Sequence, residues 1–277
     1  MNQLYTKSLI LFLSFFLITS QAQAIYGGSP IDPDMRKSVV NIKLKLGVCT
    51  GTLIAPNIVL TAAHCKDMSK APEFAAWLDG DVHSENTGCD VSKVIDFAYA
   101  PNAQPIFPRK VHSPDILFLK LEKPLCSATP AMVQSEQLMP GDELLETGFG
   151  GRGGQGAFFD NHQISLKIIE TPEAPQSMTT TEHKLFTRLL ELASDSYLFA
   201  LPTAENTTAC TGDSGGPVFV NDSGRMQVYG VIGAVFPHSE LGSTKCNNGY
   251  LQLITPVAPY YDWIQETVQS WKPIKKI

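Results

Sequence analysis

The stretch of the chain that most strongly suggests chemistry is Cys210-Thr211-Gly212-Asp213-Ser214-Gly215-Gly216-Pro217. A serine flanked by glycines suits a nucleophile on a tight turn, because glycine adopts backbone angles that other residues disfavour. The backbone N–H groups of Gly212 and Ser214 would then face the oxygen that becomes negative during attack. The alternative interpretation is a glycine-rich surface turn, since short motifs carry false positives.

A histidine and an aspartate elsewhere in the chain complete the set that such a serine needs. A serine hydroxyl is a poor nucleophile at neutral pH and requires a base, and a histidine suits that role. The histidine in turn requires a carboxylate that fixes its tautomer and stabilises its cation. His64 ends a predicted strand, beside a cysteine whose disulfide would hold it. Asp115 opens an apolar run, where a buried carboxylate would need a partner.

Length and composition exclude some classes of function. The chain has 277 residues, of which 43% are hydrophobic and 17% are charged. This is enough for one large or two small domains with a buried core. The net charge of -6 argues against nucleic-acid binding, which requires a basic surface. The other histidines show no metal-ligand spacing, so we expect no metal.

The first 24 residues have the pattern of a secretory signal. Lys7 precedes an apolar run at residues 9–18 that is too short to span a bilayer, and Ala22-Gln23-Ala24 fits a cleavage site. No later run is long enough for a membrane helix. We therefore expect a secreted, extracellular or periplasmic protein without a membrane span. Six cysteines in an exported chain predict three disulfides, and six cysteines allow fifteen pairings.

The pattern of apolar residues predicts an all-β fold. Alternating or continuous apolar runs separated by turns indicate strands. They lie at residues 40–46, 49–54, 58–61, 115–121, 144–149, 163–169, 197–201, 218–220, 228–236 and 250–254. Residues 66–113 are rich in proline and glycine, so their strands should be short. Helices are expected at 184–192 and 259–271. Many strands without β-α alternation indicate a barrel or a sandwich.

Residues 61–65, 115–119 and 212–217 together resemble the three signatures of trypsin-like serine proteases. The resemblance implies a protease domain at 25–277 after the signal peptide at 1–24. Its fold would be two antiparallel six-stranded β-barrels, at about 25–135 and 136–258, and a C-terminal α-helix at about 259–271. It implies that His64 is the general base, Asp115 orients it and Ser214 is the nucleophile. The N–H groups of Gly212 and Ser214 would form the oxyanion hole.

The same resemblance assigns a role to Ile25. The segment Ile25-Tyr26-Gly27-Gly28 is similar to the mature N-terminus of the family, whose freed amino group pairs with the residue matching Asp213 and holds the oxyanion hole open. Cleavage after Ala24 would release Ile25 directly, whereas cleavage after Ala22 would leave a two-residue block. The alternative is that Ile25 is an ordinary residue after a signal.

The family pattern also implies disulfides and a substrate pocket. It pairs Cys49 with Cys65 and Cys210 with Cys246, which leaves Cys89–Cys126 by elimination. The pocket residues would be Thr208, Gly233, Val235 and Gly249. They carry no charge, so we expect a preference for small or medium uncharged side chains before the cut. Gly233 lacks the hydroxyl that normally supports the triad carboxylate, which predicts some loss of activity or a substitute donor elsewhere.

These features predict a secreted serine endopeptidase that acts through an acyl-enzyme and needs no cofactor. Its partners would be protein or peptide substrates and protein protease inhibitors, with no nucleic acid. The rival hypothesis is a non-catalytic homologue that serves as a binding module, since fold does not fix function. An esterase on the same scaffold is a weaker third hypothesis, because its acyl transfer to water is the same chemistry.

Overall fold

The computed structural model describes residues 25–44, 47–67, 75–77, 89–106, 111–150, 161–172, 180–193, 196–237 and 249–271. The strands of the first half form a closed antiparallel barrel. In spatial order its strands are β2 (Val39–Leu44), β3 (Gly47–Ala55), β4 (Ile58–Thr61), β9 (Leu117–Leu121), β6 (Val91–Tyr99) and β5 (Ala75–Trp77). The predicted alternation holds in β2, where Val40, Ile42 and Leu44 are buried.

The second half forms another antiparallel sheet. Its order is β1 (Ser29–Pro30), β12 (His162–Ile169), β11 (Glu143–Gly148), β14 (Pro217–Asp222), β15 (Arg225–Pro237), β16 (Gly249–Pro256) and β13 (Leu198–Pro202). Because β12 also pairs with β13, the strands β11 to β16 pair in a ring. A short strand, β10 (Met132–Val133), runs parallel to β15. The predicted all-β architecture of two barrels is confirmed.

Few helices accompany the barrels in the described residues. They are α1 (Pro33–Arg36), α2 (Ala63–Asp67), α3 (Thr180–Ala193), the 3-10 turn η3 (Ala258–Tyr260) and α4 (Tyr261–Trp271). A small hairpin of β7 (Gln104–Ile106) and β8 (Val111–Ser113) precedes β9. None of these helices combines the length and the apolar character that a membrane span requires.

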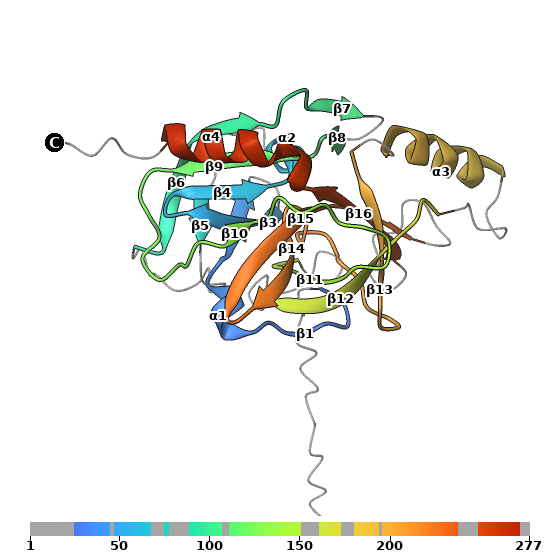
Figure 1. Ribbon diagram of the computed structural model, residues 1–277, viewed down its shortest axis with the longest axis horizontal. Coiled ribbons are helices and arrows are strands. Elements are labelled where there is room, and N and C mark those ends of the chain that lie inside the picture. Colours follow the sequence, from blue (N-terminus) through green and yellow to red (C-terminus); the bar gives the residue numbers. More distant parts are fainter. Residues whose placement is uncertain are drawn as a thin grey trace, which may run out of the picture.

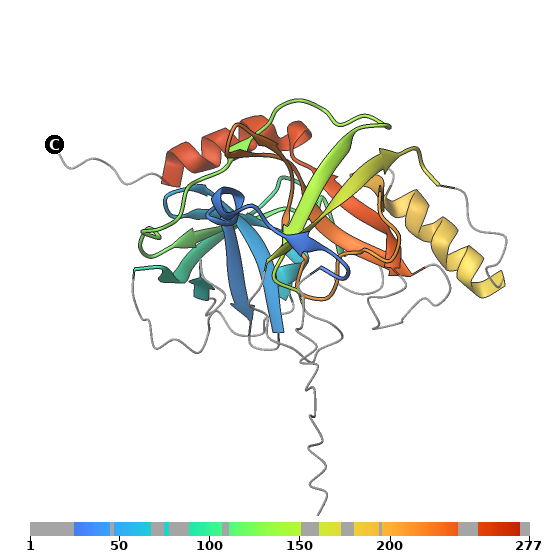
Figure 2. The same cartoon turned by 90° about the horizontal axis from the view of Figure 1, so that it is seen from below.

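The two ends of the described chain cross over between the barrels. The C-terminal helix α4 follows the second barrel but covers the first, where Trp263 stacks on Phe118 of β9 with ring centroids 4.8 Å apart. Conversely, β1 near the N-terminal end pairs with β12 of the second barrel. Figure 1 shows α4 lying over β6 and β9, and Figure 2 shows the two barrels side by side, with α4 on the side of the first. The crossed ends hold the two barrels together.

The structure differs from three local expectations. His64 does not end a strand: it lies in α2, the helical turn that follows β4. Asp115 does not open a strand either, because β9 begins at Leu117. Residues 66–113 also contain one long strand, β6. Its pattern was hard to recognise because apolar residues such as Ile95 and Phe97 point to solvent.

Candidate active site

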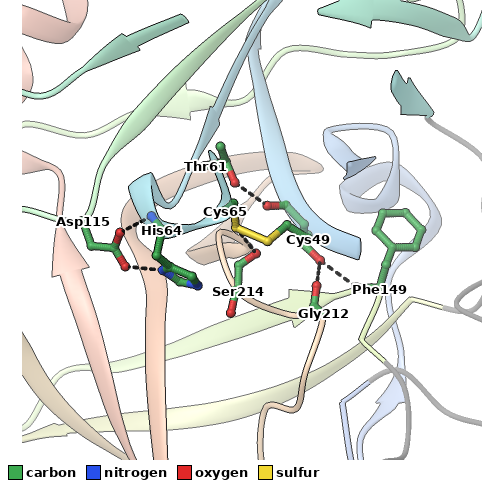
Figure 3. Close-up of a disulfide and its surroundings, with 9 residues drawn as sticks. Cys49, Thr61, His64, Cys65, Asp115, Phe149, Gly212 and Ser214 are labelled. Atoms are coloured by element: carbon green, nitrogen blue, oxygen red, sulfur yellow. Dashed lines mark hydrogen bonds and ion pairs between the residues drawn. A yellow bond between two sulfur atoms is a disulfide. The ribbon is translucent and has the colours of Figure 1, made fainter. Parts of the chain in front are cut away.

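The histidine and aspartate predicted from the sequence are joined in the structure (Figure 3). Asp115 is fully buried. One of its carboxylate oxygens accepts the backbone N–H of His64 at 2.9 Å, and the other lies 2.6 Å from the ring Nδ1. The carboxylate therefore fixes both the start of α2 and the orientation of the imidazole ring. With the Nδ1 proton directed at Asp115, the Nε2 atom is left to accept a proton.

Ser214 lies near this pair and contacts the disulfide next to His64. Cys65 follows His64 in α2 and is bonded to Cys49 of β3. The Cys65 Sγ is 3.6 Å from the carbonyl oxygen of Ser214. Figure 3 draws Ser214 on the side of the imidazole ring that faces away from Asp115. The fold thus gathers the three predicted catalytic residues into one region.

The loop that carries Ser214 has the backbone conformation that its glycines predict. Gly212 has a φ of 103° and Gly215 a φ of 84°, both in the region that favours glycine. A Cβ atom at Gly215 would collide with Thr61 of the first barrel. Within the part of the chain that the structure describes, the backbone N–H groups of Gly212 and Ser214 donate no hydrogen bond. Both donors are therefore available to a bound oxygen.

A buried threonine of the first barrel holds this loop in place. The backbone N–H of Thr50 donates to the carbonyl of Ser214 at 2.9 Å, and its hydroxyl donates to the carbonyl of Gly212 at 2.8 Å. The same hydroxyl accepts the backbone N–H of Phe149 at 2.9 Å. Thr50 lies in β3, so the first barrel fixes the Ser214 loop through two hydrogen bonds and is tied to Phe149 through a third.

The aspartate before the serine is fully buried and accepts only backbone donors among the described residues. Gly150 donates to one Asp213 oxygen and Cys210 to the other, each at 2.7 Å. The backbone N–H of Ile25 also donates to it. Burial nevertheless raises the pKa of Asp213 to about 7, because these donors only partly replace its hydration. Ile25 is itself fully buried, and its backbone nitrogen interacts with Asp213.

The predicted pocket residues occupy different positions in the second barrel. Thr208 is buried, and its backbone pairs with Tyr26, one residue after Ile25. Gly233 and Val235 lie in β15.

The pairing of β15 with β16 shows which residues face the pocket residues. Gly249 lies opposite Pro237 at the start of β16, whereas the residue opposite Val235 is Gln252. Directly opposed residues of an antiparallel pair share one face of the sheet, so Gln252 lies on the face of Val235.

Two buried polar residues near the predicted pocket, Gln252 and Glu146, were not predicted from the sequence. The Gln252 amide donates to Glu146 of β11 at 2.7 Å, and both side chains are fully buried. Burial raises the pKa of Glu146 to about 8, and the charge of Asp213 adds to this effect, while the bond from Gln252 opposes it. Glu146 is therefore protonated near neutral pH. The available signal was a carboxylate within the apolar run at residues 144–149.

The structure also contains disulfides and one group of potential metal ligands. Cys89 is bonded to Cys126. Cys210 is also in a disulfide, while its predicted partner Cys246 lies outside the described residues.

Within the described ranges, the potential metal ligands that lie together are Cys49, His64 and Cys65. The disulfide between the two cysteines removes both thiolates that such a site would use.

Comparison with known proteins agrees with this architecture. The family model described as Trypsin matches residues 25–264. Kallikrein-11 of Homo sapiens is 26% identical over 228 residues, covering 80% of this chain and 72% of the relative. Tissue-type plasminogen activator of Homo sapiens is 26% identical over 230 residues, covering 80% of this chain and 39% of the relative. The solved structure of mouse neuropsin, a serine protease, has a TM-score of 0.64 at 18% identity, covering 87% and 99% of the two chains.

The family match extends over most of the chain and includes the segments that carry His64, Asp115 and Ser214. The chain therefore belongs to the trypsin family of serine-type endopeptidases.

The buried acid Glu146 leads to a prediction about stability. A carboxylic acid whose pKa is raised from 4.5 to about 8 binds its proton more tightly in the folded state than in the unfolded chain. The folded protein should therefore lose stability as pH rises between those values, by at most about 5 kcal/mol. Glu146→Gln keeps the hydrogen-bonding shape without an ionisable group, so it should reduce this loss.

Urea denaturation of both proteins at pH 5 and pH 8 measures the effect. Glu143→Gln, a change of an exposed acid in the same strand, serves as the matched control. An equal drop in stability for wild type and Glu146→Gln would contradict the prediction.

Proposed function

We propose that this protein is a secreted endopeptidase that hydrolyses peptide bonds through a Ser214-His64-Asp115 triad and an acyl-enzyme. The observation that carries the proposal is the double contact between Asp115 and His64 beside the Ser214 loop. It supports the proposal because it orients the ring and directs the Nδ1 proton to the carboxylate, which leaves Nε2 as a base.

In the acylation step, the Ser214 Oγ attacks the carbonyl carbon of the substrate while His64 Nε2 takes the hydroxyl proton. Asp115 stabilises the resulting imidazolium. The negative oxygen of the tetrahedral intermediate would accept the free N–H groups of Gly212 and Ser214. Loss of one such donor typically lowers the rate by about 10²–10³. The intermediate collapses when His64 gives its proton to the leaving amine.

In the deacylation step, water attacks the acyl group on Ser214 and His64 takes a proton from that water. The second tetrahedral intermediate uses the same oxyanion hole. Its collapse returns the proton from His64 to the Ser214 Oγ and releases the carboxylic acid product. The cycle leaves the enzyme unchanged and needs no metal or organic cofactor.

The second part of the proposal is that cleavage after Ala24 activates the enzyme. In the uncleaved chain the Ile25 nitrogen is a peptide donor to Asp213, and the Ile25 φ of 49° is unusual for a β-branched residue. Cleavage would convert this N–H into an ammonium at the same place and remove the carbonyl that makes the conformation costly. The new charge would lower the pKa of Asp213 and fix the adjacent oxyanion loop.

The third part is a preference for small or medium uncharged side chains before the cut. Thr208 carries no charge. Val235 and Gly233 would form one wall of the substrate pocket, and the valine side chain would narrow that pocket. The neighbouring Gln252 bonds to Glu146, whose pKa of about 8 keeps it neutral near pH 7. No formal charge is thus available from these residues to bind lysine or arginine. The partners would be proteins or peptides outside the cytoplasm, including protein inhibitors.

The triad predicts covalent labelling of one serine. A fluorophosphonate probe should label wild type at Ser214 and abolish peptide cleavage, because it traps the activated nucleophile. Ser214→Ala should lose labelling and about 10⁶-fold in kcat. Ser270→Ala, a change of an exposed serine in α4, should leave both unchanged. An unlabelled wild type would instead favour a non-catalytic binding module.

The activation proposal predicts that only one N-terminus gives full activity. A form beginning at Ile25 should be active, and a form beginning at Gln23 should retain at most about 1% of that activity, since breaking a buried ion pair costs about 3–5 kcal/mol. The active form should also lose activity from about pH 8 upward as its amine deprotonates. N-terminal sequencing and a pH profile test this, and a fully active species beginning at Gln23 would refute it.

The pocket proposal predicts the outcome of peptide-library profiling. The residue before the cut should be alanine, valine or another small or medium uncharged type. Val235→Gly should widen the pocket and raise kcat/KM for larger apolar residues by about 10–200-fold per accommodated methylene. Val220→Ala, which changes an exposed valine of β14, is the control. A wild-type profile dominated by lysine or arginine would overturn the proposal.

A further inference from the structure

A second polar side chain reaches the carboxylate that orients His64. Tyr197 immediately precedes β13, and only 4% of it is exposed. Its hydroxyl lies beside the Asp115 carboxylate and the Thr255 hydroxyl of β16, close enough for both groups to affect its pKa. Burial first, and then the charge of Asp115, raise the pKa of Tyr197 well above its ordinary value. The phenol therefore remains protonated and can act as a donor to Asp115.

The space for this ring is created by a glycine. A Cβ atom at Gly233 would lie 2.8 Å from the Tyr197 Cε1 atom, closer than side chains tolerate, and 3.1 Å from the carbonyl oxygen of Leu253. The ring thus occupies the volume that a side chain at position 233 would fill. Any residue larger than glycine at that position would push the phenol away from Asp115.

Hydrogen bonds also tie the Tyr197 segment to the segment that carries Asp115. The Ser113 hydroxyl donates to the Ser196 hydroxyl at 2.6 Å. Ser113 is two residues before Asp115, and Ser196 is one residue before Tyr197. The Tyr260 hydroxyl lies beside the same serine, close enough for that serine to affect its pKa. These contacts connect segments 83 residues apart in sequence and restrict the approach of the phenol to the carboxylate.

We propose that Tyr197 is a positioning residue for the catalytic pair: its hydroxyl donates a third hydrogen bond to Asp115, in the space left by Gly233. The backbone N–H and the Nδ1 of His64 supply the other two contacts. A fully buried carboxylate needs such donors, because it has lost its hydration and has about four acceptor sites. This inference rests on the proposed triad, through which Tyr197 acts without touching the substrate.

The test is Tyr197→Phe, which removes the hydroxyl and keeps the ring. We expect kcat to fall about two- to tenfold, the net value of one hydrogen bond, while KM stays unchanged. Without this donor the carboxylate should hold the protonated imidazole more tightly. The acidic limb of the kcat/KM profile should therefore move to higher pH. Among the described residues, the titratable groups that interact with Asp115 are His64 and Tyr197, and Tyr260 interacts with Tyr197.

The matched control is Tyr229→Phe, which removes the hydroxyl of a half-exposed tyrosine of β15 and should change neither kcat nor the pH profile of kcat/KM.

A rescue variant provides a second test. Tyr197→Ala should be more impaired than Tyr197→Phe, and adding Gly233→Ser should restore part of the activity, because its hydroxyl would point toward Asp115. Gly233→Ser alone should lower activity, since it collides with the Tyr197 ring.

Rates are expressed per Ser214 labelled by a fluorophosphonate, so that misfolded protein does not enter the comparison. A wild type that does not label would refute the triad itself. A wild type that labels and cleaves, together with a Tyr197→Phe variant of unchanged kcat and pH profile, would refute only the positioning role. Failure of Gly233→Ser to improve Tyr197→Ala would also count against it.

Discussion

Asp213 places a carboxylate in the protein interior, and the loop proposed to bind an oxyanion is built around it. Removing a carboxylate from water is costly unless donors or a cation replace the water. Here Gly150, Cys210 and Ile25 supply backbone donors, and Gly148 and Gly150 lie so close that a Cβ atom on either would collide with Asp213. The raised pKa shows that these donors are not sufficient alone. A cation at the Ile25 nitrogen, as we propose for the cleaved form, would stabilise this carboxylate further.

The two barrels carry different residues of the proposed triad, and hydrogen bonds across their boundary join them. His64 and Asp115 belong to the first barrel, whereas Ser214 and its loop belong to the second. Thr50 fixes that loop through the carbonyls of Gly212 and Ser214. The Asp213 carbonyl, which shares a peptide plane with the Ser214 N–H, accepts the Gly216 N–H at 2.9 Å, so that proposed donor is oriented before any substrate arrives. Such preorganised donors are the main source of electrostatic stabilisation in acyl transfer.

The sequence predicts features that depend on local spacing better than those that depend on distant contacts. The strand β4, the hairpin of β14 and β15 and the helix α4 follow from alternation, turn residues and helical periodicity. The bond between Gln252 and Glu146 joins residues 106 positions apart. No spacing rule relates two such residues, because their meeting depends on how β11 and β16 curve around the barrel. The contact of Tyr197 with Asp115 was hidden for the same reason.

Gly233 and Tyr197 illustrate how such a hidden contact compensates for a visible change. The sequence indicates that a hydroxyl is missing at Gly233 but not what replaces it, since the proposed donor, Tyr197, lies 36 residues earlier, just before β13. A buried carboxylate constrains the position of a donor atom, not the residue that carries it. The phenol of Tyr197, just before β13, satisfies that constraint only if position 233 has no side chain. The two residues therefore form a single structural unit, in which neither can be changed without altering what the other provides to Asp115.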